Sequence, residues 1–166
     1  MRWFRFAFLI ILIMVVQASL LDKIEIAELG IKPDLLLIFL VFFAIYSGIT
    51  EAMITSFVIG LGSDIIGSSM GPQIMSFTIF GVAVAYLNRI IAIRKMPYHG
   101  AAIFAVGILT GLLAYLLGRI FSGLQPDPYI LTIVFFNSLY SAVVGPFLFL
   151  PCAWWMRIRA QKFTRH

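Results

Sequence analysis

The stretch from Asp34 to Asn88 contains no lysine or arginine, and it constrains the fold more than any other feature of the chain. A single helix of these 55 residues would be about 80 Å long. The hydrocarbon core of a bilayer is about 30 Å thick, so one crossing uses only about 20 residues. We therefore predict that this stretch folds back on itself and crosses a membrane more than once.

Composition extends this interpretation to the rest of the chain. Of the 166 residues, 62% are hydrophobic and 11% are charged, whereas a soluble domain carries about 25% charged residues. The polar side chains are too few to cover a water-facing surface, so lipid must surround most of the protein. The net charge of +5 indicates orientation rather than nucleic-acid binding, because no basic patch with interleaved aromatic residues is present. We expect an all-α integral membrane protein in which residues 1–166 form one domain.

Polar breaks divide the chain into six apolar segments. Residues 47–51 and 64–72 interrupt the long stretch, and its first two segments are short, so their helices are expected to run into the flanking turns. The six predicted transmembrane helices are residues 3–21, 34–46, 52–63, 73–87, 100–121 and 129–155.

The first of these segments has two interpretations. Arg2 and Arg5 precede an apolar core, and Val16 and Ala18 form a cleavage pattern before Ser19, as in a signal peptide. We favour a retained first span, because the remainder is a multispanning protein rather than a secreted domain.

Basic residues are distributed unequally between the two sides that six spans define. With the N-terminus inside, the outer side holds only Lys23, Lys32 and Arg119. Cytoplasmic segments carry such an excess of Lys and Arg, so both termini are predicted to be cytoplasmic. Five spans would place the basic tail opposite another basic segment, and four would leave about 35 uncharged residues without a membrane. The nine cytoplasmic basic residues are Arg2, Arg5, Arg89, Arg94, Lys95, Arg157, Arg159, Lys162 and Arg165.

Asp64 is the most informative polar residue, because ionisable groups at membrane depth are expensive. It lies among glycines in the sequence GLGSDIIGSSMG. It either contacts a partner or ligand, or it ends a helix in interfacial water. The flanking glycines let a partner come near, so we expect Asp64→Ala to weaken partner binding more than folding.

Catalytic patterns are weak. Intramembrane aspartyl proteases use G-x-G-D and a second Asp, but Gly60, Gly62 and Asp64 are one residue out of register. The other span-associated Asp, Asp34, lacks the usual preceding tyrosine. His99 and His166 lie outside the spans, and no His/Cys/Glu cluster has metal-ligand spacing. We expect no enzyme activity, metal or cofactor.

The last two spans carry features that indicate helix packing. Small residues let helix backbones approach closely, so a stripe on the fifth span is expected to pack within the monomer, with a homodimer interface as the alternative. Asn137 must form a hydrogen bond inside the membrane, and such a residue more often holds helices together than binds a ligand. Pro146 and Pro151 are expected to kink or end the sixth helix. The stripe consists of Gly107, Gly111, Ala114 and Gly118.

Three parts of the sequence together resemble the rod shape-determining MreD family. KPDLLLIFL, with Pro33 and Asp34, is similar to the start of that family's second span. Asn137 and Pro146 match an Asn and a Pro of its last span. Pro72, which follows Gly71, departs from the small or polar residue that is common at that position in the family. The central motif of the family corresponds here to Gly60, Asp64, Gly67 and Gly71.

The resemblance implies a function that composition could not indicate. MreD proteins are non-enzymatic scaffolds in the bacterial inner membrane, within the machinery that elongates the peptidoglycan cell wall. They bind the single-span protein MreC and work alongside MreB, RodA and a penicillin-binding transpeptidase.

A second implication is a small-molecule binder. The family is similar in architecture to the six-span substrate-binding components of energy-coupling-factor vitamin transporters. Such a component needs converging polar groups at its outer face, and the candidates are Asp34, Asp64 and Gln73, with Asn88 predicted on the other side.

Overall fold

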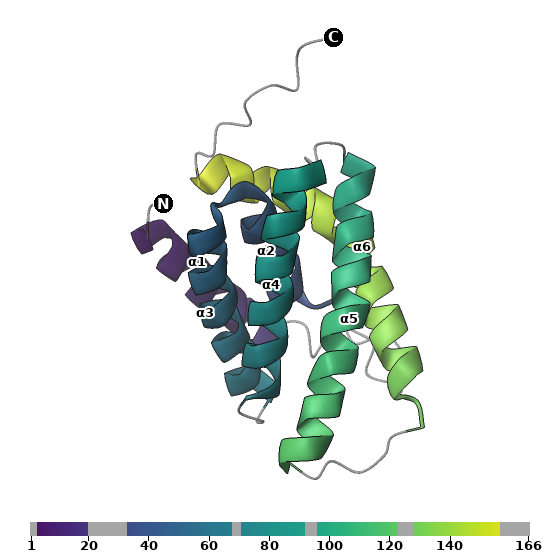
Figure 1. Cartoon of the computed structure of the whole chain (residues 1–166). Helices are drawn as coiled ribbons and strands as arrows, with labels where there is room; N and C mark the ends of the chain where they lie inside the picture. Colours follow the sequence, from purple (N-terminus) through teal and green to yellow (C-terminus); the bar gives the residue numbers. More distant parts are fainter. Residues whose placement is uncertain (1–2, 20–32, 68–70, 92–95, 123–127, 157–166) are drawn as a thin grey trace.

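The computed structural model describes residues 3–19, 33–67, 71–91, 96–122 and 128–156 (Figure 1). These residues form six α-helices that follow the six predicted apolar segments closely, which confirms the all-helical fold class. The helices are α1 (Trp3–Ser19), α2 (Leu35–Tyr46), α3 (Ile49–Gly67), α4 (Pro72–Ile91), α5 (Met96–Ser122) and α6 (Ile130–Met156). Other predicted features, namely residues 22–32, Arg94, Lys95, residues 125–127 and the basic residues 157–165, lie outside the described residues.

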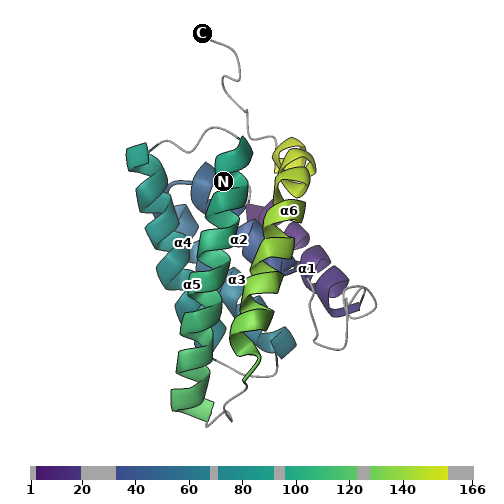
Figure 2. The same ribbon diagram turned by 90° about the vertical axis from the view of Figure 1, so that its right-hand side faces the viewer.

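Four of the described helices, α3 to α6, are long and apolar enough to cross a membrane. They run side by side as the main body of the bundle in Figures 1 and 2. The helices α1 and α2 are shorter, and α2 has only 12 residues. At a rise of about 1.5 Å per residue α2 is about 18 Å long, well below the bilayer core of about 30 Å.

The prediction that the second helix would run into its flanking turns is wrong. It stops at Tyr46, where the backbone N–H of Ser47 donates to the carbonyl of Phe43 at 2.9 Å. The Asn88 side chain of α4 donates to the carbonyl of Ile45 in the last turn of the helix (2.7 Å). These two bonds satisfy the carbonyls of Phe43 and Ile45, and α2 ends at the half-buried residues Tyr46 and Ser47. The third helix does extend beyond its apolar segment, from Ile49 to Gly67.

The centre of the bundle is α2. Ten of its residues, Leu36 to Ile45, are buried, and the helix contacts all five other helices. Its aromatic rings pack at the centre of the core. The ring centroids of Phe43 and Phe6 of α1 are 5.0 Å apart in an edge-to-face arrangement, and those of Phe42 and Phe149 of α6 are 5.2 Å apart. A helix that is apolar on every face is typical of such a fully enclosed position.

The C-terminal part of α6 changes direction, as Figure 1 shows in yellow. Pro146 and Pro151 lie inside this helix. Proline removes a backbone donor and clashes with the preceding turn, which bends a helix. The bend agrees with the expectation that these prolines would kink α6.

Candidate functional site

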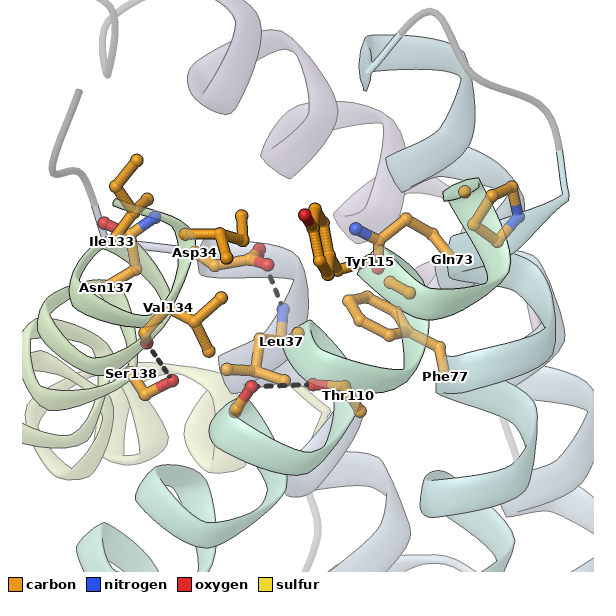
Figure 3. Close-up of a pocket in the computed structure, with 16 residues that line it drawn as sticks. Asp34, Leu37, Gln73, Phe77, Thr110, Tyr115, Ile133, Val134, Asn137 and Ser138 are labelled. Carbon is orange, nitrogen blue, oxygen red and sulfur yellow. Dashed lines mark hydrogen bonds between the residues drawn. The ribbon is translucent and has the colours of Figure 1, made fainter. Parts of the chain in front are cut away.

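Because the central helix α2 is short, a cleft lies in the half of the bundle beyond its N-terminus. Figure 1 shows α2 beside the ends of α4 and α6, while α5 and the start of α6 extend far past it. The cleft has a volume of about 320 Å³ and runs from the N-terminus of α2 to the start of α6 (Figure 3). Its lining residues are Asp34, Leu37, Pro72, Gln73, Phe77, Gly107, Thr110, Gly111, Ala114, Tyr115, Gly118, Ile130, Ile133, Val134, Asn137 and Ser138.

Asp34 stands at the inner end of this cleft, where α1, α2 and α6 meet. Its Oδ1 accepts from the backbone N–H of Leu37 at 3.1 Å, which makes Asp34 the N-cap of α2. The side-chain amide of Gln17 donates to the same oxygen at 3.2 Å, while its carbonyl accepts from the N–H of Leu36. The Asp34 N–H donates to the Ser141 hydroxyl at 2.8 Å. These contacts hold the carboxylate in a defined position.

Polar groups also stand on the other walls. Gln73 comes from α4, Tyr115 from α5 and Asn137 from α6, and Figure 3 shows them around the same space. The hydroxyls of Thr110 and Ser138 donate to carbonyls of their own helices at 2.7 Å. The polar character of the cleft therefore comes mainly from one carboxylate, two amides and a phenol, against walls that are otherwise apolar.

The predicted stripe of small residues forms one wall, and its upper part packs against α6. A Cβ at Gly107 would lie 2.6 Å from the Ser138 hydroxyl and 2.9 Å from a methyl of Leu37. A Cβ at Gly111 would lie 2.8 Å from a methyl of Val134. The missing side chains thus allow α5 and α6 to approach closely within one chain, and they leave the space that becomes the cleft.

Gly111→Leu is expected to reduce the yield of folded protein. A leucine side chain there must displace Val134, and overpacking of this kind costs about 1–3 kcal/mol. Size-exclusion chromatography of detergent-extracted protein measures the effect, with Ala105→Leu as control, because Ala105 is exposed on the same helix. Loss of monodisperse protein is the expected result. A smaller, well-folded species would instead identify a dimer face, and an unchanged profile would contradict packing by this stripe.

The central motif of Gly60, Asp64, Gly67 and Gly71 lies away from the cleft, at the turn between α3 and α4. Asp64 is completely buried, and its carboxylate accepts from the backbone N–H groups of Gly71 (2.8 Å), Gln73 (3.0 Å) and Ile74 (3.0 Å). It therefore caps the N-terminus of α4 from the end of the preceding helix. Gly71 has φ +120°, a conformation that favours glycine, and Pro72 occupies the first position of α4, where no N–H is needed.

The two carboxylates serve different helices. Asp34 caps α2 and Asp64 caps α4, and their hydrogen bonds involve different partners. An aspartyl protease needs two carboxylates that share one site, and these bonds do not place the pair in one. Within the described part of the chain, no group of three His, Cys, Asp or Glu side chains could hold a metal ion.

The remaining predicted residues do not line the cleft. Pro33 is buried just before α2, and Gly67 is exposed at the end of α3. Gly60 packs against the backbone of α4, and Pro146 lies in α6 near Gly100. The cleft thus brings together Asp34, Gln73, Asn137 and the small-residue stripe, while the central motif builds the α3–α4 turn.

Sequence reasoning missed Gln17, Tyr115 and Ser141. Gln17 is a lone amide in the first apolar run, and an unexplained polar group in a span is itself a signal. Ser141 lies four residues after Asn137, so the two share a helix face. Tyr115 had no comparable signal, because aromatic residues are common throughout this chain.

One comparison with known proteins gives a match. A family model described as rod shape-determining protein MreD matches residues 1–159. The chain belongs to the MreD family. The resemblance seen in the sequence is therefore confirmed, and it places the protein among membrane-associated shape-determining proteins. Searches of curated proteins and of solved structures found no match.

Proposed function

We propose that this MreD family member is a non-enzymatic inner-membrane scaffold of the cell-elongation machinery that makes peptidoglycan in rod-shaped bacteria. The family match over residues 1–159 carries the proposal. In this role it binds MreC and works in the same complex as MreB, RodA and a penicillin-binding transpeptidase. A second copy of the chain is a further candidate partner.

The proposed arrangement has six spans with both termini in the cytoplasm. In this topology the cleft, which lies where α5 ends and where α2, α4 and α6 begin, opens toward the periplasmic side. The position suits a partner such as MreC, whose soluble domain is periplasmic. We propose that a membrane-proximal segment of MreC docks in the cleft.

Topology can be tested by single-cysteine labelling. In a Cys152→Ser background, a cysteine at Lys95 is expected to resist a membrane-impermeant reagent in intact cells and to react after lysis, because the positive-inside rule places this loop in the cytoplasm. A cysteine at Gln125 is the matched periplasmic control and should react in both. Reaction at position 95 in intact cells would overturn the arrangement.

Partner binding can be tested by filling the cleft. Ala114 is buried in its wall, so Ala114→Leu adds volume inside the cleft, whereas Ala105→Leu adds the same volume at an exposed position of α5. Tagged wild type and Ala105→Leu are expected to co-purify MreC from membranes and to restore rod shape to depleted cells. Ala114→Leu should do neither at equal abundance. Failure of the wild type to capture MreC rejects the scaffold proposal, and full capture by Ala114→Leu rejects the docking site.

The cleft also supports a second candidate function, binding of a small molecule. Its volume of about 320 Å³ falls at the lower end of ligand pockets, and Asp34, Gln73 and Asn137 supply converging polar groups. A small-molecule binder should be stabilised by its ligand, so thermal unfolding of the purified protein in the presence of vitamins tests this. Stabilisation that Ala114→Leu abolishes would favour the transporter-like function.

A further inference from the structure

The last part of α6 does not continue in the direction of the bundle. The stretch of this helix that is long and apolar enough to cross a membrane is Ile130–Phe149, yet the helix runs on to Met156. We call residues 147–156, which follow Pro146, the C-terminal limb. In Figures 1 and 2 the limb lies at the end of the bundle where α2 and α4 end, and in Figure 1 it runs across that end. A helix that turns sideways there is placed to lie along a membrane surface.

The inner face of the limb is fixed to the core. The ring centroid of Phe149 lies 5.2 Å from that of Phe42 and 6.3 Å from that of Tyr46, both in α2. It lies 5.2 Å from the ring centroid of His99 in α5. Cys152, three residues later on the same helix face, is also buried. These contacts hold the limb against the end of the short helix α2, so its sideways direction is part of the packed fold.

The opposite face of the limb is apolar, and the described part of the chain leaves it open. Phe147 is 73% exposed and Trp154 is 80% exposed, and Pro151 between them is exposed too. Their spacing of four and then three residues places them on one helix face. Apolar surface of this kind is unfavourable in water. Tryptophan instead favours the boundary between hydrocarbon and headgroups, because its ring is apolar and its N–H is polar.

The charge of the chain on this side suits anionic headgroups. Arg157 and Arg159 follow the limb directly in the sequence, and no Asp or Glu occurs between residues 128 and 166. In the proposed topology the cytoplasmic side carries nine basic residues and one acidic residue, Glu51, counted over the full sequence. Basic residues beside an interfacial helix are attracted to anionic phospholipids.

We propose that the C-terminal limb is an interfacial anchor. It lies in the headgroup region of the cytoplasmic leaflet, with Phe147 and Trp154 in contact with lipid, and it prefers anionic phospholipids. The part of α6 before the bend then makes the membrane crossing by itself. The proposal goes beyond the scaffold role, and only its assignment to the cytoplasmic leaflet rests on the proposed topology.

Spin-label depth measurements test the position of the limb. In a Cys152→Ser background, Phe147→Cys and Trp154→Cys each carry one nitroxide at an exposed position, in vesicles of phosphatidylcholine and phosphatidylglycerol. Relaxation by oxygen and by a water-soluble nickel complex reports the depth of each label. We expect the two labels to lie at equal depth, at the level of the headgroups. Seven residues of a membrane-crossing helix rise about 10 Å, so a continuing span would separate the two labels by that depth.

The same helix supplies a matched control pair before the bend. Phe136→Cys and Val143→Cys have the same spacing and are also exposed, and their labels should differ in depth by about 10 Å. An equally large difference between positions 147 and 154 would overturn the proposal, since α6 would then continue as a straight span. Full access of the aqueous reagent to both limb labels would overturn it too, because that face would then be open to a protein partner rather than covered by lipid.

Lipid selectivity tests the charge preference without any change inside the limb. Spin-labelled phosphatidylglycerol is expected to associate with the wild type in preference to spin-labelled phosphatidylcholine. Arg157→Gln/Arg159→Gln should lower this preference several-fold, whereas Arg119→Gln, in the last turn of α5, should retain most of it. Equal preference in the wild type and the double variant would overturn the assignment to anionic lipid. Neither measurement uses MreC, so its outcome is independent of whether the scaffold proposal holds.

Discussion

Asp64→Ala is expected to cause a large loss of folded protein. The carboxylate is fully buried and accepts three backbone N–H groups, from Gly71, Gln73 and Ile74. Alanine leaves all three donors without their partner at the start of α4, and each buried donor left unsatisfied costs about 1–3 kcal/mol. The sequence suggested that partner binding would suffer more than folding; these contacts reverse that expectation.

Asp64→Asn should lower the unfolding midpoint less than Asp64→Ala does, because the two carboxylate oxygens accept different numbers of hydrogen bonds. Oδ2 accepts from Gly71 and Ile74, while Oδ1 accepts from Gln73. An asparagine with its oxygen in the Oδ2 position keeps two bonds and turns its own donor toward the third N–H. Thermal unfolding of detergent-solubilised protein should rank wild type above Asn and Asn above Ala. Ile65→Ala is the control, since Ile65 is the adjacent residue and is 54% exposed. Equal midpoints for wild type and Asp64→Ala, with loss of MreC capture, would restore the partner-binding interpretation.

Gly60→Ala and Gly81→Ala are expected to separate α3 from α4. A Cβ at Gly60 would lie 2.8 Å from the Cα of Ile74, which is backbone and cannot rotate away. A Cβ at Gly81 would overlap the Ser56 side chain and lie 2.6 Å from its Cβ. Such overpacking costs about 1–3 kcal/mol or more. Between membrane helices there is little hydrophobic force to recover the lost packing.

The same chain supplies a matched control for these glycines. A Cβ at Gly48 meets nothing within 4 Å, so Gly48→Ala should leave the unfolding midpoint almost unchanged. Removing the opposing side chain in Gly81→Ala/Ser56→Gly should recover part of the lost stability, because the clash lies between these two positions. Accumulation of Gly60→Ala and Gly81→Ala at the level of Gly48→Ala would show that the two helices are not in tight contact.

The helices could be predicted from the sequence because each signal was local. The apolar runs, the break at Ser47 and Gly48, and the two prolines of α6 all act within a few residues of where they appear. The hydrogen bond that satisfies the last turn of α2 could not be predicted from its own residues. It depends on Asn88, whose side chain bonds the Ile45 carbonyl from a helix far along the chain.

In the candidate site, too, local features could be predicted from the sequence, whereas contacts between distant residues could not. The stripe from Gly107 to Gly118 was visible as a helix face, but its double use, in packing and as a cleft wall, depends on where α2 begins. Asp34 and Asn137 were each noticed as single residues, yet only the fold brings them to one cleft. The role of Asp64 depends on the approach of Gly71, Gln73 and Ile74 after the turn, which spacing alone does not reveal.

The enclosed position of α2 also has a consequence for biosynthesis. Membrane insertion of a single helix relies on about 20 apolar residues, and α2 has 12, so it should enter the bilayer together with α3 as a hairpin. Three of the helices that contact it, α4, α5 and α6, are synthesised after this hairpin. Until they arrive, one side of α2 must face lipid or an insertion chaperone. The final step of maturation is then the closure of α5 and α6 around a helix made long before them, and the cleft exists only after that closure.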